Sequence, residues 1–102
     1  MAKMLQCGKN QIAGPVPVHG FGMGLNKTKA MQAAMDMAHG FANLVAATRA
    51  AEFKCSTDKG CPKMIDHQVA NEKTTELVTV NLQNNLYLSV VRHSFDIVIF
   101  CQ

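Results

Sequence analysis

The clearest chemical possibility in this sequence is a pair of cysteines within a predicted loop. Cys55 and Cys61 enclose the residues STDKG, and Pro62 follows them. Ser, Thr, Asp, Gly and Pro in such a cluster are typical of a loop, and two cysteines this close can bridge where the Cα separation allows it. We therefore expect a Cys55–Cys61 disulfide. Cys7 is expected to be a free thiol, and Cys101 a small buried hydrophobic residue.

Metal binding is an alternative use of the same loop. Cys55, Cys61 and His67 recur at intervals of six residues, and zinc accepts both thiolate and imidazole ligands. A fourth ligand would come from Cys7, Cys101 or His93. Because paired cysteines in structural zinc sites are usually only two to four residues apart, a zinc site is the second hypothesis for this loop.

A second set of soft ligands lies at 31–39. Met31, Met35, Met37 and His39 fall within nine residues, and thioethers with imidazole suit Cu(I). On a helix, however, Met31 and Met35 share one face, whereas Met37 and His39 lie on different ones. Methionines at helical spacing usually fill gaps in a core, so copper is the weaker metal hypothesis.

Histidines on two predicted strands could form a small polar site. His19 and His93 are expected to meet across the sheet and, with Tyr87 and Ser89, to line its outer face. Histidine is the commonest general acid or base, so a small enzyme using His19 and His93 is one hypothesis. Such residues more often form an ordinary solvated face, and no paired carboxylates or Ser-His-Asp order stand out. A non-catalytic protein is therefore the stronger expectation.

The glycine-rich stretch GFGMGLNKT precedes the predicted helix. Glycines before a helix N-terminus can cradle a phosphate, and Lys27 with Thr28 imitates the end of a P-loop. Asn26 stands where that motif requires glycine, so a flexible strand-to-helix corner is the better interpretation. Gly22 and Gly24 remain candidates for ligand contact because glycine allows close approach of a ligand.

One long amphipathic helix over residues 26–54 is the central predicted element. Asn26 is a good N-cap, since its side-chain oxygen can accept from an early helical N–H. The predicted buried stripe follows the three-and-four spacing of a helix and comprises Ala30, Ala34, Met37, Phe41, Leu44, Val45 and Ala51. Alanines around the rest of the cylinder would let a sheet approach closely.

Three or four strands are predicted around this helix. Residues 15–23, 74–82 and 86–93 form strands, and 94–96 form a turn or bulge before an apolar strand at 97–101. The QNN sequence at 83–85 predicts a tight hairpin, because Asn tolerates the left-handed conformation. Residues 1–14 are expected to form a mobile arm, and residues 63–73 are expected to be irregular.

Alternation of side chains assigns the faces of the two hairpin strands. The inward set is Val78, Val80, Leu82, Leu88 and Val90. The outward set is Leu77, Thr79, Asn81, Tyr87, Ser89 and Val91.

These elements predict a single α+β domain over residues 1–102, with an antiparallel sheet of three to four strands packed on one long helix. The strand-helix-strand-strand order resembles that of small oligomeric proteins such as the dodecins. The resemblance is one of element order and brings no binding residues with it. An apolar strand at 97–101 would be buried on both faces, either within the chain or against another subunit.

Composition favours an associating protein. Only 17% of the residues are charged while 48% are hydrophobic, so little charge is available to cover a monomer's surface. The net charge is +3 and its basic residues are scattered, which disfavours nucleic acid. No apolar run is long enough for a membrane span.

We therefore expect a small non-catalytic homo-oligomeric module that binds a protein partner or small ligand and needs no cofactor. The even number of cysteines, four, slightly favours an exported protein whose signal has been removed and to which Met1 was added.

Overall fold

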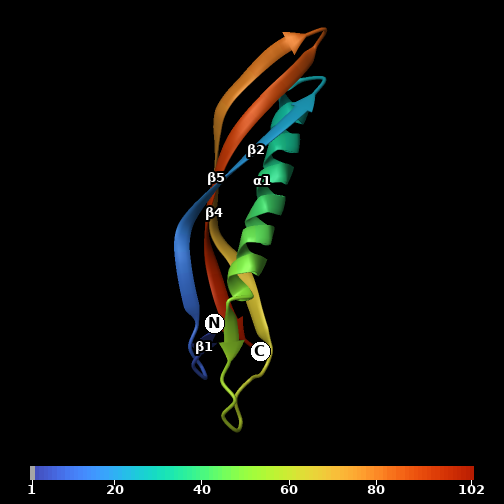
Figure 1. Ribbon diagram of the computed structural model, residues 1–102. Coiled ribbons are helices and arrows are strands. Elements are labelled where there is room, and N and C mark those ends of the chain that lie inside the picture. The colour runs from blue at the N-terminus through green and yellow to red at the C-terminus, as the bar shows by residue number, and fades with distance from the viewer. Residues whose placement is uncertain (1) are drawn as a thin grey trace.

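The computed structural model describes residues 2–102 and shows one long helix lying along one face of a three-stranded antiparallel sheet (Figure 1). The elements in chain order are β1 (Lys3–Leu5), β2 (Gln11–Gly24), α1 (Lys27–Ala50), β3 (Phe53–Cys55), β4 (Ile65–Gln83) and β5 (Leu86–Cys101). The predicted α+β class is confirmed, and the order β2-α1-β4-β5 is close to the predicted one. Met1 lies outside the described residues.

The main sheet has the strand order β2-β5-β4, so β5 is the central strand, and both its neighbours are antiparallel to it. Both termini lie at one end of the molecule, and the β4–β5 hairpin lies at the other (Figure 1). β1 and β3 form a separate two-stranded parallel sheet near the termini.

The N-terminus of α1 matches the prediction. Asn26 is the N-cap, and its side-chain oxygen accepts a hydrogen bond from the Lys29 N–H at 2.8 Å. The helix ends at Ala50, four residues earlier than predicted, because Ala51 caps it and the chain enters β3 at Phe53.

The buried stripe of α1 differs from the predicted one. It consists of alanines at every fourth position, all at most 4% exposed: Ala30, Ala34, Ala38, Ala42, Ala46 and Ala50. Phe41 and Leu44, predicted to be buried, are exposed. Only methyl groups fit in this seam because the helix lies unusually close to the sheet.

Glycines of β2 account for this closeness. A Cβ atom added to Gly20 or Gly22 would collide with the backbone of Ala34, and one added to Gly24 would lie 2.7 Å from the Ala30 nitrogen. The space over these residues is filled by the helix rather than by a ligand. Gly22 and Gly24 therefore serve packing, and the same contact argues against a phosphate cradle, the weaker of the two interpretations of this stretch.

The predicted faces of β4 and β5 are wrong because the assignment was reversed. Ser89, Val91 and His93 are buried beneath the helix, together with Phe95, Ile97 and Ile99 further along β5. The Thr79 hydroxyl lies 2.9 Å from the Ser89 hydroxyl, so Thr79 also points to the helix side. Both strands carry apolar residues on both faces, and alternation alone could not choose between them.

The N-terminal segment is not a free arm. β1 pairs with β3, Leu5 is buried, and Cys7 forms a disulfide with Cys61. The segment at 63–73 is likewise regular, since β4 begins at Ile65 and pairs with β5 from its first residue.

Two disulfides close the end of the molecule that holds both termini. They join Cys7 to Cys61 and Cys55 to Cys101. The predicted Cys55–Cys61 bridge is thus wrong, as are the free thiol at Cys7 and the unpaired Cys101. The two strands that end at Cys55 and Cys101 meet at this end of the fold, whereas the chain after β3 leads Cys61 to the loop that holds Cys7.

The predicted hairpin at 83–85 is confirmed. Asn84 and Asn85 both have positive φ, 54° and 60°, as a two-residue type I′ turn requires. β5 runs without interruption through the predicted turn at 94–96. The irregularities lie instead in its neighbours, where the register shifts between Ala13 and Val16 of β2 and between Ala70 and Lys73 of β4.

Within residues 2–102, the structure contains no helix that is both long enough and apolar enough to cross a membrane.

Candidate functional site

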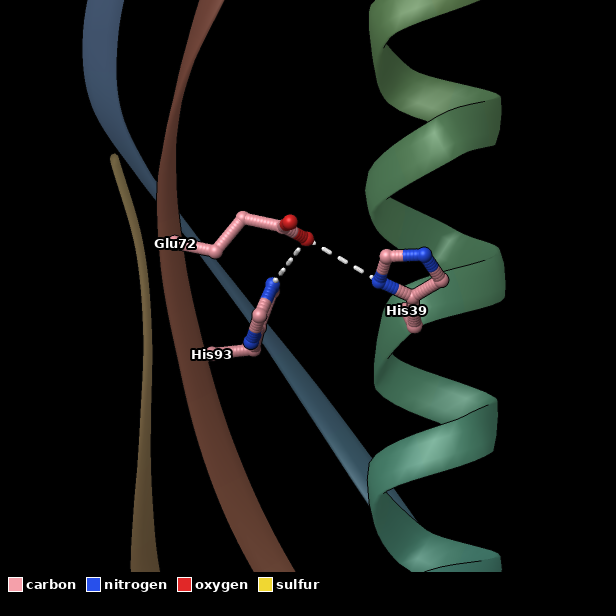
Figure 2. Close-up of side chains that lie close together, drawn as sticks. All are labelled: His39, Glu72 and His93. Carbon is pink, nitrogen blue, oxygen red and sulfur yellow. Dashed lines mark hydrogen bonds and ion pairs between the residues drawn. The ribbon is translucent and has the colours of Figure 1, made fainter. Parts of the chain in front are cut away.

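Three side chains from three elements converge between the helix and the sheet. His39 of α1 and His93 of β5 both contact the same carboxylate oxygen of Glu72, Oε1, from β4 (Figure 2). The distances are 2.9 Å from His39 Nδ1 and 3.1 Å from His93 Nε2. The imidazole rings meet edge to face, with centroids 6.1 Å apart. We call these three residues the His-Glu-His cluster.

A β-bulge aims Glu72 into the cluster. Asn71 and Glu72 together stand opposite a single residue of β5, since Ala70 pairs with Asp96 and Lys73 with Ser94. Asn71 has φ 52°, the left-handed conformation that Asn tolerates, and its amide donates to Asp96 Oδ2 at 2.8 Å. Bulges often redirect a side chain next to a functional site, and here the extra residue turns Glu72 to the helix side.

His93 is the fixed member of the cluster. The residue is only 5% exposed, its ring stacks on Phe95 with centroids 5.9 Å apart, and its Nδ1 lies 2.7 Å from the Thr74 hydroxyl. Both ring nitrogens therefore have partners. The side chains of Glu72 and His39 are 35% and 56% exposed, so the cluster opens to solvent on their side.

The second candidate is the sheet face opposite α1. Because the glycines of β2 point to the helix, Phe21 and Met23 between them point away, and they are 55% and 57% exposed. The register places Phe21 beside Val90 and Val78, and Met23 beside Leu88 and Val80. These six residues form two apolar rows across all three strands, which we call the outer patch.

A shallow polar cavity adjoins the outer patch on the same face. It has a volume of about 260 Å³ and is lined by Pro15, Pro17, Lys73, Thr75, Arg92 and Ser94. Lys73 and Arg92 make this middle part of the outer face basic, in contrast to the apolar hairpin end.

The structure separates the residues predicted for a catalytic site. His19 pairs with Arg92 on the outer face, whereas His93 is buried on the helix face, so the two histidines do not meet. Tyr87 shares the helix face with His93 but lies six residues along β5, about 20 Å away at the rise of a strand.

The predicted metal ligands are also redistributed. Cys55 and Cys61 are in different disulfides, so neither offers a thiolate while these bonds are intact. His67 of β4 pairs with Ile99 of the central strand. In the predicted copper set, the Met37 sulfur accepts a hydrogen bond from the Phe21 N–H at 3.5 Å, while His39 joins Glu72 instead.

Glu72 is the functional candidate that sequence reasoning missed. It lies in a polar stretch that lacks strand alternation, and only the bulge brings it to His93. One signal was available: Asn71 precedes it, and Asn is one of the few residues that favour the positive φ of such a bulge.

Comparison with known proteins adds no relative. No protein family model, curated protein or solved structure matches this chain.

Proposed function

We propose that this protein is a non-catalytic, self-associating module whose outer patch docks on the outer patch of a second copy. The observation that carries the proposal is the pair of apolar rows across β2, β5 and β4. Within residues 2–102, α1 packs on the opposite face of the sheet, and the side chains of the outer patch remain exposed or half-buried. Apolar surface of this kind commonly marks an interface.

The shape of the subunit supports a partner copy. Its Cα radius of gyration is 17.8 Å, whereas a globular domain of this length has a radius of about 13 Å. A monomer of 11.1 kDa is expected to expose about 5,700 Å², and this chain exposes 6735 Å². The excess, about 1,000 Å², is similar to the roughly 800 Å² that each partner buries in an interface of standard size.

Charge favours a particular arrangement of the two copies. A two-fold axis perpendicular to the strands, between the two apolar rows, would place the Phe21 row of each copy against the Met23 row of its partner. Because the patch lies at the hairpin end, the basic middle of each sheet, with Lys73 and Arg92, would extend beyond the overlap. Like charges are then kept apart while the apolar side chains are buried.

The two disulfides are compatible with an oxidising compartment. We propose on this basis that the module acts outside the cytoplasm, in the periplasm or as a secreted protein.

Sedimentation velocity on the oxidised protein tests the association. The wild type is expected to be a dimer, and Phe21→Asp combined with Val80→Asp is expected to give a monomer that keeps its circular dichroism spectrum. Leu44→Asp is the matched control, because Leu44 is exposed on α1, away from the patch. A monomeric wild type, or dissociation caused by Leu44→Asp alone, contradicts the proposed interface. A foreign protein or small ligand would then be the better candidate occupant of the patch.

A further inference from the structure

We propose that the His-Glu-His cluster is a binding site for one divalent first-row transition metal ion, with zinc as the best fit. The site is distinct from the outer patch, since it lies on the opposite face of the sheet. His39 Nδ1, His93 Nε2 and a Glu72 oxygen would be the three protein ligands.

The spacing of the ligand atoms fits zinc. The two nitrogens lie 2.9 and 3.1 Å from the shared oxygen, and all candidate ligand atoms lie within 4.8 Å of one another. In a tetrahedral zinc site with bonds of about 2.0–2.2 Å, neighbouring ligand atoms are about 3.3 Å apart. An ion could therefore enter between the three groups after small adjustments of the Glu72 carboxylate and of the exposed His39 ring.

The hydrogen bond between His93 and Thr74 suits a metal ligand. A metal-bound histidine usually donates its other ring N–H to an oxygen, which fixes the tautomer and the ring orientation. With zinc on Nε2, the Nδ1–H of His93 would donate to the Thr74 hydroxyl, already 2.7 Å away. A hydroxyl can donate or accept, so Thr74 satisfies His93 in the metal-free state too, when Nε2–H donates to Glu72.

The other two ligands allow entry and adjustment. His39 is on the surface of the helix, and its side chain is 56% exposed, so it can turn to meet an ion. Because the cluster opens to solvent on this side, a water molecule can take the fourth position. Two histidines, one carboxylate and an open position are typical of zinc sites that exchange a ligand.

The donor set also selects among metals. Two imidazoles and one carboxylate suit zinc and its first-row neighbours, whereas Cu(I) favours sulfur ligands. All four cysteines are held in disulfides, so no cysteine thiolate of this chain competes with the cluster for the metal ion. The negative charge of one carboxylate beside two neutral imidazoles favours a divalent cation.

Isothermal titration of the oxidised protein with zinc tests the proposal. We expect one zinc ion per chain for the wild type. His39→Ala and Glu72→Gln should each weaken zinc binding at least tenfold, and His19→Ala, which removes an exposed histidine of the outer face, should leave it unchanged. The two test positions are partly or largely exposed, so both variants should fold, as circular dichroism would verify.

Visible absorption of bound Co²⁺ provides a second readout, which does not depend on the heat of binding. The wild type should give the visible absorption bands of a four- or five-coordinate Co²⁺ ion, and Glu72→Gln should lose them. The proposal is overturned if the wild type binds no zinc up to millimolar concentration, or if both variants bind as the wild type does. The cluster would then be a hydrogen-bonded link between helix and sheet and nothing more.

Discussion

Gly22 of β2 lies directly against the backbone of Ala34 in α1, so close that a Cβ atom at Gly22 would overlap the Ala34 nitrogen. Ala34 is itself completely buried. The absence of one side chain on the strand and the single methyl group on the helix are thus two parts of the same contact. This contact sets the separation between helix and sheet. That separation in turn allows His39 to reach Glu72.

Opposite effects are expected for alanine at Gly22, which lies in this contact, and at Gly40, which lies outside it. Gly22→Ala should destabilise the protein by about 1–3 kcal/mol, the usual cost of overpacking. The atoms that the added methyl group would meet are the Ala34 nitrogen and the carbonyl carbon and Cβ of Ala33, all of them fixed to the helix backbone and unable to turn aside. Gly40→Ala should stabilise it by up to about 1 kcal/mol, because an added methyl group there meets nothing within 4 Å and alanine favours a helix interior. Urea denaturation of both variants measures the difference. Equal free energies of unfolding would contradict the close packing of α1 on β2.

The disulfide pairing can be read from an unreduced tryptic digest. Trypsin separates all four cysteines, which fall in residues 4–9, 55–59, 60–63 and 93–102. The structure predicts that residues 4–9 are linked to 60–63 and residues 55–59 to 93–102. A species that joins 55–59 to 60–63 would contradict this pairing and support the Cys55–Cys61 disulfide expected from sequence spacing.

Loss of either disulfide should be costly. The bridges close loops of 54 and 46 residues, and the chain-entropy model gives about 4 kcal/mol for each. Because the two loops overlap in sequence, the combined effect of removing both should be smaller than the sum. Thermal melts of Cys7→Ser/Cys61→Ser, of Cys55→Ser/Cys101→Ser and of the quadruple variant measure this. A melting temperature unchanged by either double substitution would contradict the prediction.

Local signals in the sequence predicted the fold better than the faces of its elements. The N-cap at Asn26 and the turn at Asn84 and Asn85 depend on neighbouring backbone groups, and both were predicted correctly. The buried stripe depends on what the helix packs against. The larger residues Phe41 and Leu44 looked like core, whereas the glycines of β2 leave room only for alanine.

Long-range relationships could not be predicted in the same way. Cys55 and Cys101 are brought together by strands that are distant in the sequence, and spacing favoured the nearer Cys61. His39 was placed on a polar helix face and His93 on a strand, but the bulge that unites them with Glu72 depends on the pairing of β4 with β5. Only a known register reveals that Asn71 and Glu72 share one partner position.

The bulge therefore provides a test of how Glu72 is positioned. Asn71→Gly should be tolerated, because glycine adopts φ 52° without strain. Asn71→Val should destabilise the protein by about 1–2 kcal/mol, since a β-branched residue is strained in the left-handed region. If the register of β4 shifts to relieve that strain, Glu72 leaves the cluster. Urea denaturation gives the stability, and an NMR spectrum of the histidine rings reports whether His39 and His93 keep their environment. Equal stability of the two variants would count against the bulge.

Thr74 provides the most selective test of the buried histidine. Thr74→Val keeps the shape of the side chain but removes the hydroxyl beside His93 Nδ1, which leaves a polar atom of a 5% exposed residue without its partner. The expected cost is about 1–3 kcal/mol in the free energy of unfolding. Thr74→Ser is the matched control, because it keeps the hydroxyl and should retain most of the stability.

Metal affinity should follow the same order, since loss of an outer-shell partner typically weakens binding by about 10–100-fold. Zinc titrations on both variants separate the two roles of the hydroxyl: a stability loss in Thr74→Val with unchanged zinc affinity would mean that Thr74 supports the fold but does not orient His93 toward an ion.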